Sequence, residues 1–578
     1  SLARGMHRMA RRNALINRLA AVETLGATTV ICTDKTGTLT ENRLTVTHLV
    51  LPDAGPRELP ADAVPPALAT ARARLLDAGR RCNNAVLHGE QGIGDPLEVA
   101  LLLAALDLPA IDVERVTEEP FDPVRRLMAT VHGTPGNYRI AVKGAPEAVL
   151  ARCGAVVDGD GTQPIDTAQR QRWLAANEAL AARGLRVLAL ARRQCDTLPD
   201  DPYADLSLLG LVGLMDPPRA DVASAIADCR AAGIRVVMVT GDQLATARHV
   251  AQTLGLTDGD GAVLPGEALE RLQDFGGEAA VLAARVFARV SPAQKMALVT
   301  HLQARGEVVA MTGDGVNDAP ALKQADIGVA MGQRGTQVAR EAAAMVLRDD
   351  AFASIAAAVA QGRVIFGNIR RFAVYLLSCN LSEVLVVGLA TLAGGPLPLL
   401  PLQILFLNLV TDVFPALALG AGEADGSEMR QPPRPPGEPI LTTRHWRQVV
   451  GYGMAITVAT LLAFAIALGP LAATPPQAVV VAFLTLALAQ LWHVVNMRPA
   501  GSPLLGNAVT RNRYVWAALG LCVALLGAAV YWPPLAVVLH LAPPDAAQWG
   551  LIGVASLLPV AGRWVVDSLR GGACHATP

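Results

Sequence analysis

Long apolar stretches fill the last third of this 578-residue chain, and they constrain its fold more than any other feature. Six runs are each close to the roughly 20 residues that a helix needs to cross a bilayer. They lie at 370–393, 399–420, 447–469, 477–496, 514–532 and 547–566. A buried soluble helix would explain any one of these runs, but not six in succession. Residues 366–578 are therefore predicted to form an all-α membrane domain of six spans.

The connectors between these runs predict how the domain is oriented. Arginines crowd the loops 430–447 and 498–513, and they also occur at 370–371 and 563–570. The remaining connectors contain no Lys or Arg. Because basic loops stay on the cytoplasmic side, the sequence predicts a multi-pass protein of the inner (cell) membrane. Its N-terminal head domains and its C-terminus are expected to be cytoplasmic.

Composition excludes several functional classes. The 49 basic and 50 acidic residues nearly cancel, so the chain has no general electrostatic attraction for nucleic acid. Its eight cysteines are scattered and form no C-x-x-C pair. This pattern is typical of a reduced compartment, and it argues against a disulfide framework or a thiolate metal module.

The first 370 residues show an α/β pattern. Short apolar runs at 28–32, 235–239, 308–311 and 327–330 are each followed by Gly and Asp and then by a helical pattern. Such alternation predicts a parallel sheet covered by helices. Catalytic loops in these sheets lie at the carboxyl ends of the strands. An insertion over 49–213 has strand and helix patterns of its own.

The string I-C-T-D-K-T-G-T-L-T places a single carboxylate, Asp34, directly after the first of these strands. A carboxylate in that position can attack the γ-phosphate of ATP and become an aspartyl phosphate. Lys35 and the Thr36 hydroxyl can hold the transferring oxygens, and Gly37 lets the backbone approach them. An ordinary strand-to-loop turn with a solvated Asp is the alternative, but five specified residues in a row rarely occur by chance.

A second string, M-T-G-D-G-V-N-D-A-P, supplies Asp314 and Asp318 at another strand end. Carboxylates gathered beside Asp34 repel one another unless a hard cation shares them, and Mg²⁺ is the usual solution. The predicted magnesium site comprises Asp34, Thr36, Asp314 and Asp318. Asn317 can hydrogen-bond the phosphoryl group or a metal-bound water.

Two further segments can contact phosphate. The string V-T-G-D offers Thr240, Gly241 and Asp242, whose hydroxyl and free backbone N–H groups suit phosphate oxygens. Alone, such a T-G-D string is more often a turn than a site. Lys295 can act as a clamp on the negative charge that develops during transfer.

Together these strings resemble the haloacid-dehalogenase-like phosphorylation domain of the P-type cation-transporting ATPases. The family's nucleophile, magnesium and phosphate positions match Asp34, Asp314, Thr240 and Lys295. The resemblance implies a discontinuous α/β phosphorylation domain over 21–48 and 214–365, and an inserted α+β nucleotide-binding domain over 49–213. It also implies a stalk helix over 1–20, ATP as substrate and Mg²⁺ as cofactor.

The insertion should hold the nucleotide. Phe121 can stack on adenine with Arg126 near the phosphates, although ordinary core packing is the alternative for Phe121. The string A-V-K-G-A-P-E resembles the family's nucleotide-pocket loop and makes Lys143 an ATP contact. Similarity to family motifs adds Glu98 and Arg186 to the nucleotide contacts. The alternative for Arg186 is that it is a solvated residue at the end of a strand or helix. The predicted nucleotide contacts are Glu98, Phe121, Arg126, Lys143, Arg186 and Arg289.

Polar residues inside the spans are candidate ligands of a transported substrate. Lipid makes such groups costly, so each is expected to belong to a site. Asn380 and Glu383 are three apart on one face of the first span, and Asn408, Thr411 and Asp412 share a face of the second. All are oxygen donors, which suits a hard cation such as Ca²⁺. Hydrogen bonding between helices is the alternative, and it explains the two carboxylates poorly.

These two strings resemble the fifth and sixth membrane helices of the sarcoplasmic-reticulum type (type II) calcium pumps at all five ligand positions. Gln490 stands where two-site pumps have a glutamate in the eighth helix. The resemblance therefore implies one ion per cycle and Ca²⁺ as the cation, with Mn²⁺ and Na⁺ as alternative ions.

Pumps of this family begin with an actuator domain that bears a T-G-E loop, followed by four membrane helices. No T-G-E string occurs in this sequence. The chain is thus interpreted as the C-terminal portion of such a pump, with a separate N-terminal half as a possible partner. A membrane-tethered phosphatase of the same superfamily and a non-transporting ATP-binding remnant or subunit are the alternatives.

Overall fold

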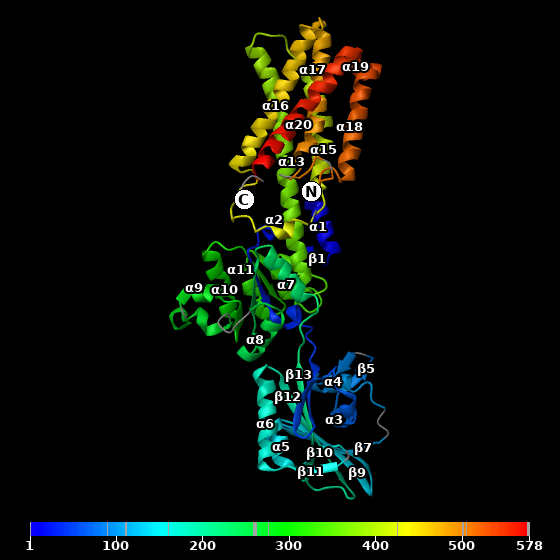
Figure 1. The fold of residues 1–578 in the computed structure, drawn as a ribbon, viewed down its shortest axis with the longest axis vertical. Helices are drawn as coiled ribbons and strands as arrows, with labels where there is room; N and C mark the ends of the chain where they lie inside the picture. The colour runs from blue at the N-terminus through cyan, green and yellow to red at the C-terminus, as the bar shows by residue number, and fades with distance from the viewer. Residues whose placement is uncertain are drawn as a thin grey trace.

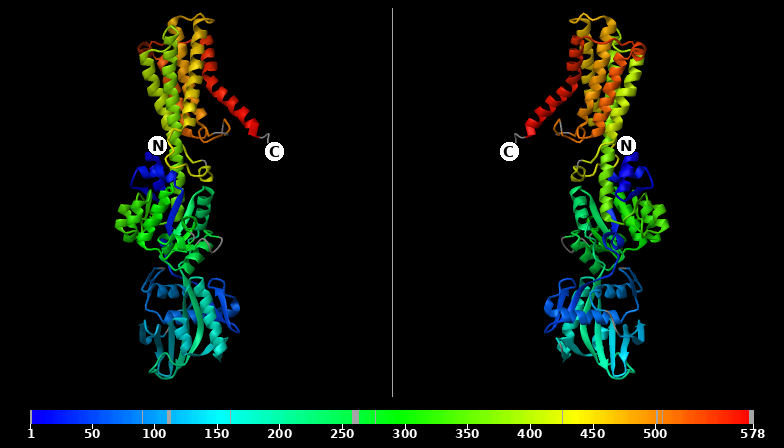
Figure 2. Two further views of the ribbon diagram at one scale, coloured as in Figure 1. Left: turned by 90° about the vertical axis from the view of Figure 1, so that its left-hand side faces the viewer. Right: turned by 90° about the vertical axis from the view of Figure 1, so that its right-hand side faces the viewer.

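The computed structural model describes residues 2–89, 91–109, 113–159, 161–257, 263–275, 277–424, 426–499, 502–504 and 506–574. These residues are arranged in three parts along one long axis (Figures 1 and 2). A bundle of helices lies at one end, an eight-stranded sheet with helices lies in the middle, and a nine-stranded sheet lies at the far end.

The middle part contains the eight-stranded sheet in the order β1-β19-β18-β17-β2-β14-β16-β15. All neighbouring strands are parallel except β1 and β19. The four strands predicted from apolar runs are confirmed as β2, β14, β17 and β18. The bounds are β1 (Ala14–Ile16), β2 (Val30–Asp34), β14 (Arg235–Val239), β15 (Val263–Pro265), β16 (Val286–Ala288), β17 (Val309–Gly313), β18 (Ile327–Met331) and β19 (Met345–Leu347).

Helices cover this sheet, so its central strands are mostly apolar. Val30, Ile31 and Cys32 of β2 are fully buried. Because β2, β14 and β17 are parallel, the loops that follow Asp34, Val239 and Gly313 meet at one edge. The covering helices are α2 (Ala20–Gly26), α7 (Val222–Ala231), α8 (Leu244–Thr253), α9 (Gly277–Ala283), α10 (Pro292–Ala304), α11 (Ala319–Gln324) and α12 (Gln337–Ala342).

The predicted helix over residues 1–20 is shorter in the structure. Helix α1 spans Leu2–Arg11, and Asn13 then adopts a left-handed backbone conformation with φ of 63°. A helix cannot continue through such a residue. The apolar residues Ala14–Ile16 instead form β1 and pair with β19 at the edge of the sheet.

The far part contains the nine-stranded sheet, in which β10 and β13 are parallel and the other pairs antiparallel. Its strands are β3 (Thr45–Pro52), β4 (Pro56–Pro60), β7 (Arg115–Asp122), β8 (Leu127–Thr134), β9 (Asn137–Gly144), β10 (Cys153–Asp158), β11 (Gly161–Pro164), β12 (Arg186–Cys195) and β13 (Leu206–Met215). Its helices are α3 (Ala69–Arg81), α4 (Pro96–Ala104), α5 (Pro146–Arg152) and α6 (Thr167–Ala182), and β5 (Val86–His88) pairs with β6 (Gln91–Ile93) nearby.

Two paired strands connect the far part to the middle part. In β3 and β13, Leu49 is the partner of Val212 and His48 is the partner of Gly213. The predicted domain limits at residues 49 and 213 thus lie one position apart in the register of one antiparallel ladder. The middle part and the far part each have a buried cluster of their own, around Leu298 and Leu75 respectively, and a third buried cluster contains residues of both parts.

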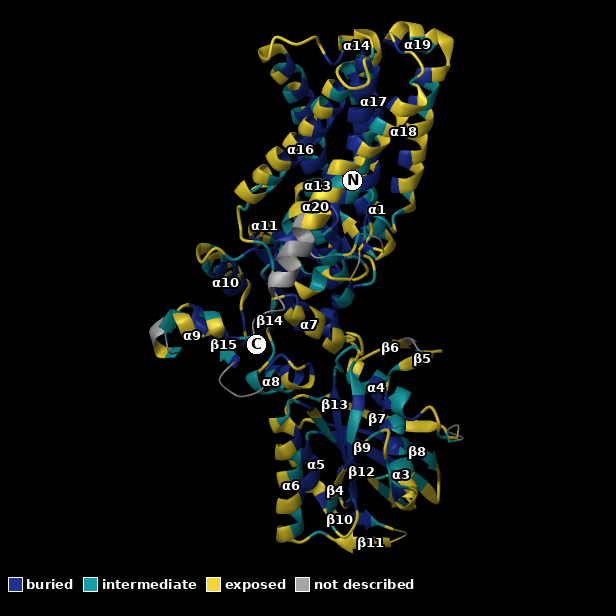
Figure 3. Cartoon of the chain, turned by 45° about the horizontal axis from the view of Figure 1, so that its top comes forward, coloured by how far each residue is buried: buried dark blue, intermediate teal, exposed yellow. Residues whose placement is uncertain are grey.

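The helical bundle begins with α13 (Phe352–Leu392), a 41-residue helix about 60 Å long that runs from the middle part into the bundle (Figure 1). The other bundle helices are α14 (Pro401–Leu407), α15 (Val413–Gly420), α16 (Thr443–Leu468), α17 (Pro475–His493), α18 (Arg513–Tyr531), α19 (Pro533–Leu539) and α20 (Ala546–Cys574). Helix α17 is the most buried, whereas α16 and α18 expose one face each (Figure 3).

Among the described residues, five helices are long and apolar enough to cross a membrane, at 352–392, 401–420, 443–468, 475–497 and 513–531. This count is one fewer than the six spans predicted. The sixth run, 547–566, lies within α20, which carries Gln548, Pro559 and Arg563. The structure describes the side chains of this helix only up to residue 565, so the end of the predicted run lies outside the residues whose side chains are described.

Candidate functional site

The edge where β2, β14 and β17 end brings Asp34 and Lys295 together. Lys295 lies in the first turn of α10, which begins with a capping box between Ser291 and Gln294. The Lys295 Nζ lies 2.6 Å from Asp34 Oδ2 and 2.9 Å from Asp318 Oδ1. One buried ammonium therefore bridges two carboxylates that come from different loops.

Burial and charge act against each other in this cluster. Burial raises the pKa of Asp34, although the Lys295 ammonium and the Thr36 backbone N–H both oppose that shift. Burial also raises the pKa of Asp314, and the nearby Asp34 and Asp318 raise it further. Burial would lower the pKa of Lys295, but its two carboxylate partners raise it above the usual value. Three carboxylates thus surround one ammonium, and the excess negative charge suits a cation.

Asp318 holds the loop after β17 in place. Its Oδ2 accepts hydrogen bonds from the backbone N–H groups of Asp314 at 3.2 Å and Gly315 at 3.1 Å. A Cβ on Gly313 would lie 2.5 Å from the Asp318 Cβ, so only glycine allows this close approach. Both carboxylate oxygens of Asp318 therefore already accept bonds from the protein, one from the loop and one from Lys295.

The loops after β2 and β14 are joined by a second ion pair. Gly37 takes a φ of 76°, which turns the chain directly after Asp34. The Lys35 Nζ lies 2.5 Å from Asp242 Oδ2, and the Asp242 backbone N–H donates to Thr240 Oγ1 at 3.1 Å. The predicted residues of these two loops therefore lie side by side.

Three other predicted residues lie at the surface of this edge. Thr36, Asn317 and Arg289 are exposed. Arg289 follows β16 with a φ of 53°, and its backbone N–H donates to Asp242 O at 2.9 Å. Arg289, a predicted nucleotide contact, thus lies beside the eight-stranded sheet, whereas the other predicted nucleotide contacts lie in the far part.

The donor set at this edge fits a magnesium ion that also binds phosphate. Within the ranges that the structure describes, no group of three or more His, Cys, Asp or Glu side chains could hold a metal ion alone. Mg²⁺ does not require such a group, because it keeps several waters and is held by one or two carboxylates together with substrate phosphates. Asp34 and Asp314 offer oxygen donors of this kind.

The far part gathers most of the predicted nucleotide residues. Lys143, on β9, is buried, and its Nζ lies 2.5 Å from Glu98 Oε1 and donates to Cys82 O at 2.7 Å. Glu98, in the first turn of α4, also accepts the Asn84 N–H through Oε2. The structure therefore places Lys143 and Glu98 in one buried ion pair.

Phe121 and Arg126 lie near that pair in the sheet. Phe121, on β7, is 57 % exposed, which contradicts the alternative that it is an ordinary core residue. Arg126, in the turn that follows, has a φ of 57° and lies 2.7 Å from Glu147. A Cβ on Gly144 would lie 2.3 Å from Arg126 O, so the loop after Lys143 packs directly on this turn. Arg186, exposed, begins β12.

Inside the bundle, residues Asn408–Asp412 form a π-helical turn between α14 and α15. Single π-turns occur frequently at functional sites. The Tyr375 hydroxyl donates to Thr411 O at 2.7 Å. The Asn380 Nδ2 donates to Asp412 Oδ2 at 3.0 Å, whereas the buried Asp412 Oδ1 has no hydrogen-bond partner within the described part of the chain.

Gln490, on α17, joins the two groups of predicted cation ligands. Its Nε2 donates to Glu383 Oε1 at 3.1 Å, and its Oε1 accepts the Thr411 hydroxyl at 2.8 Å. The structure thus brings Asn380, Glu383, Thr411, Asp412 and Gln490 together from three elements. Asn408 is half-buried and opens the π-turn.

Two neighbours of these sites were missed by the sequence analysis. Thr312 Oγ1 accepts a hydrogen bond from the Asp34 backbone N–H at 2.9 Å. Thr312 is the second residue of the M-T-G-D string, and this position was its only signal in the sequence. Tyr375, whose hydroxyl donates to the π-turn, lies about one and a half helical turns before Asn380. A hydroxyl group inside a predicted span was the signal that could have identified it.

Family models match most of the chain. The model described as "cation transporting ATPase, C-terminus" matches residues 396–568, and "P-type ATPase, cytoplasmic domain N" matches 72–221. Two models described as "haloacid dehalogenase-like hydrolase" match 150–323 and 294–359. With the two sheets and the helical bundle, these matches confirm the predicted fold class, apart from the number of spans.

Several relatives align along the chain. A "Calcium-transporting ATPase" of Bacillus subtilis is 38 % identical over 586 residues, which cover 97 % of this chain and 66 % of the relative. A calcium-transporting ATPase of Listeria monocytogenes is 39 % identical over 92 % of this chain and 61 % of its own length. A "Probable cation-transporting ATPase F" of Mycobacterium tuberculosis is 46 % identical over 76 % of this chain and 52 % of the relative.

The chain therefore spans slightly less than two thirds of the Bacillus subtilis relative and about half of the mycobacterial one. Within that length, the strings around Asp34 and Asp314, the two sheets and the apolar helices all agree with the family matches. The chain belongs to the P-type cation-transporting ATPases.

Proposed function

We propose that this chain takes part in ATP-driven transport of Ca²⁺ across a membrane through an aspartyl phosphate on Asp34. The observation that carries the proposal is the Asp34–Lys295–Asp318 bridge at the edge of a haloacid-dehalogenase-like sheet. The family uses ATP and Mg²⁺ in general, and several relatives are named calcium-transporting ATPases. The intramembrane carboxylates do not favour the alternative of a tethered phosphatase.

In this proposal Asp34 is the nucleophile. One of its carboxylate oxygens attacks the γ-phosphorus of ATP, the bond between that phosphorus and the β–γ bridging oxygen breaks, and ADP leaves. Lys295 and the loop of Thr240, Gly241 and Asp242 stabilise the charge on the phosphoryl oxygens. Lys35 lies at that loop through its ion pair with Asp242.

Asp34 and Asp314 would hold Mg²⁺, which neutralises phosphate charge when bound. Because both oxygens of Asp318 already accept bonds from the protein, we assign Asp318 to the positioning of Lys295 and of the Asp314 loop. Thr36 and Asn317 remain candidates for contacts to this metal and to its water, since both are exposed at the same edge.

We propose that ATP binds to the nine-stranded sheet with its base on Phe121. Arg126, Arg186 and the buried Lys143–Glu98 pair would line the remainder of this pocket, and Arg289 would contact the nucleotide from the other sheet. The exposed ring of Phe121 supports this assignment, because stacking against a base would bury apolar ring surface that is exposed to solvent.

Changing Phe121 to Ala is expected to weaken ATP binding by about 1–3 kcal/mol, the range for the loss of base stacking. Isothermal titration of the purified full chain with ATP measures this. Val124→Ala is the matched control, since Val124 is 90 % exposed in the turn that follows β7 and its truncation should leave the affinity unchanged. Equal affinities of wild type and Phe121→Ala would place the base elsewhere.

We further propose that the cation binds between α13, the π-turn and α17, with ligands from Asn380, Glu383, Asn408, Thr411, Asp412 and Gln490. The orphaned Asp412 Oδ1 supports this site, because a buried carboxylate oxygen without a donor is costly unless a cation meets it. The set consists of oxygen donors only, which suits Ca²⁺.

Changing Asp412 to Asn or Glu383 to Gln is expected to weaken Ca²⁺ binding to the purified chain more than about tenfold, because each change removes one of two ligand charges. Binding of radioactive Ca²⁺ at equilibrium measures the effect, with Na⁺ and Mn²⁺ as competing ions. Thr391→Val is the control on the same helix, since the Thr391 hydroxyl bonds Val387 O on that helix. Wild-type Ca²⁺ affinity in the double variant would exclude this site.

The chain is a multi-pass membrane protein, and we propose that both sheets lie on its cytoplasmic side, with the basic loops. We also propose that a complete transport cycle requires a partner segment with a T-G-E loop, which this sequence does not contain. Cysteine labelling from either side of sealed vesicles, at Thr246 on the head and at Leu397 between α13 and α14, tests the orientation.

A further inference from the structure

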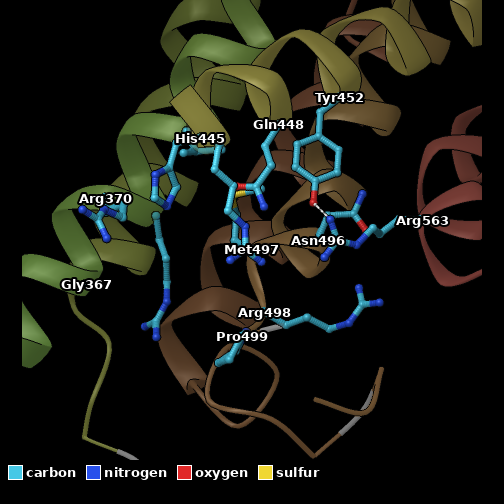
Figure 4. A pocket seen from close by; sticks show the side chains of 13 residues that line it. Gly367, Arg370, His445, Gln448, Tyr452, Asn496, Met497, Arg498, Pro499 and Arg563 are labelled. Carbon is cyan, nitrogen blue, oxygen red and sulfur yellow. Dashed lines mark hydrogen bonds between the residues drawn. The ribbon is translucent and has the colours of Figure 1, made fainter. Parts of the chain in front are cut away.

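A basic cavity of about 260 Å³ lies at the end of the bundle that faces the sheets (Figure 4). It is formed by α13, by the start of α16, by the residues that follow α17 and by α20. Five arginines line it: Arg370, Arg371, Arg444, Arg498 and Arg563. There is no Asp or Glu among the described residues that line this cavity.

Hydrogen bonds to nearby oxygens help to position three of these arginines. Arg563 donates to the Tyr452 hydroxyl at 2.5 Å, Arg371 donates to Asn368 Oδ1 at 3.0 Å, and Arg498 donates to Val495 O at 3.5 Å. Arg370 is paired with Glu438 at 2.7 Å. The cavity therefore presents several fixed guanidinium groups, which recognise phosphate well because of their planar donor geometry.

A buried acceptor also lines the cavity. Asn496 is only 3 % exposed, and its Oδ1 has no hydrogen-bond partner within the described residues. A buried amide oxygen without a donor is costly, so a ligand hydroxyl would stabilise it. The lining therefore suits a ligand that carries both a negative charge and a hydroxyl donor.

A second cavity of about 470 Å³ continues from the first and shares Arg444, Gln448, Tyr452 and Arg563 with it. It runs between α16 and α20, and its remaining lining is Arg447, Gly451, Ala455, Leu558, Pro559 and Gly562. Apart from Arg447 this lining is apolar, and α16 is one of the candidate membrane spans. An acyl chain fits such a groove, whereas a free phosphate ion would occupy only the basic cavity.

We propose that these two cavities bind one anionic phospholipid. Its phosphate lies among the arginines, a headgroup hydroxyl donates to Asn496 Oδ1, and one acyl chain follows the groove between α16 and α20. Basic pockets between membrane helices bind anionic headgroups because each guanidinium near the surface adds attraction to the phosphate. Phosphatidylglycerol has the charge and the hydroxyl groups that this lining requires.

The experiment measures binding of individual lipids to the purified full chain in detergent by native mass spectrometry. Phosphatidylglycerol is compared with phosphatidylcholine of the same acyl chains and with inorganic phosphate. Phosphatidylglycerol is expected to bind more than about tenfold more tightly than phosphatidylcholine. Inorganic phosphate at equal concentration should not displace it.

Two kinds of variants distinguish the contribution of the headgroup to lipid binding from that of the acyl chain. Arg444→Gln should weaken phosphatidylglycerol binding about fivefold, and Arg444→Gln with Arg498→Gln more than about tenfold. Arg511→Gln is the matched control, because Arg511 lines a different cavity and its loss removes the same charge. Gly451→Leu and Gly562→Leu should also weaken lipid binding, since a Cβ at either position meets open space and the longer side chain fills the groove.

Melting temperatures measured without lipid identify any variant that fails to fold, and Arg444 is exposed, so its single variant should fold normally. Equal binding of the two lipids would overturn the proposal. Binding in Arg444→Gln as tight as in Arg511→Gln would also overturn it. If inorganic phosphate displaces phosphatidylglycerol and the glycine variants bind lipid normally, the cavity is a site for a free anion, and the lipid assignment is wrong.

Discussion

Replacing Asp34 by Asn is expected to reduce phosphorylation of the chain by ATP more than about a thousandfold, because the variant has no nucleophile. The amide keeps the size of the carboxylate and leaves the bridge between Lys295 and Asp318 intact, so the sheet should stay folded. Transfer of γ-labelled phosphate from ATP, followed by acid quenching, measures the effect. The label on the wild type should be released by hydroxylamine, as an acyl phosphate is.

Asp228→Asn provides the matched control, since Asp228 is exposed on α7 of the same part and the change removes the same charge. Its labelling should equal that of the wild type. Hydroxylamine-sensitive label that persists at wild-type level in Asp34→Asn would show that another residue accepts the phosphate. The assignment of Asp34 would then be wrong.

Replacing Lys295 by Met is expected to lower the free energy of unfolding of the middle part by about 3–5 kcal/mol, the cost of breaking a buried ion pair from one side. The change leaves the Asp34 and Asp318 carboxylates buried without their shared ammonium. Phosphorylation should be lost as well, because the same ammonium stabilises the transferring phosphoryl group. Urea unfolding followed by limited proteolysis measures the stability.

A second substitution separates the structural role of Lys295 from its chemical role. Adding Asp318→Asn to Lys295→Met removes one uncompensated charge and should restore part of the stability without restoring phosphorylation. Lys323→Met, at an exposed position on α11, controls for the loss of a lysine. Full phosphorylation of Lys295→Met would contradict the proposed clamp, and unchanged stability would contradict the buried bridge.

Much of the α/β fold was predictable because local pattern and tertiary environment agree. The runs at 28–32 and 235–239 are mostly apolar, as strands buried on both faces are, and they contribute to β2 and β14. The position of Asp34 at a strand end was also predictable, because the apolar run stops there. The nearness of Asp34 to Asp314 followed from one general rule, that parallel strands end at one edge.

Other features depended on contacts that no local pattern contains. The stalk helix was predicted too long, because Asn13 and the pairing of Ala14–Ile16 with β19 are set by a strand more than 300 residues away. No local pattern indicated that residues 408–412 of the second span form a π-turn, which is held by Tyr375 and Gln490 from other helices. Within the residues that the structure describes, five candidate spans were found where six were predicted.

The sequence by itself determined which residues are candidates for the chemistry, because the Asp34 and Asp314 strings and the intramembrane carboxylates are specific in composition and spacing. It also determined the order of the parts, since hydropathy depends only on composition. Only the tertiary structure decided how those residues are divided among roles. It joined Lys295 to Asp34 and Asp318, buried Lys143 against Glu98, and gathered arginines from four elements into one cavity. Such contacts depend on how distant elements pack together, and packing is a property of the whole chain.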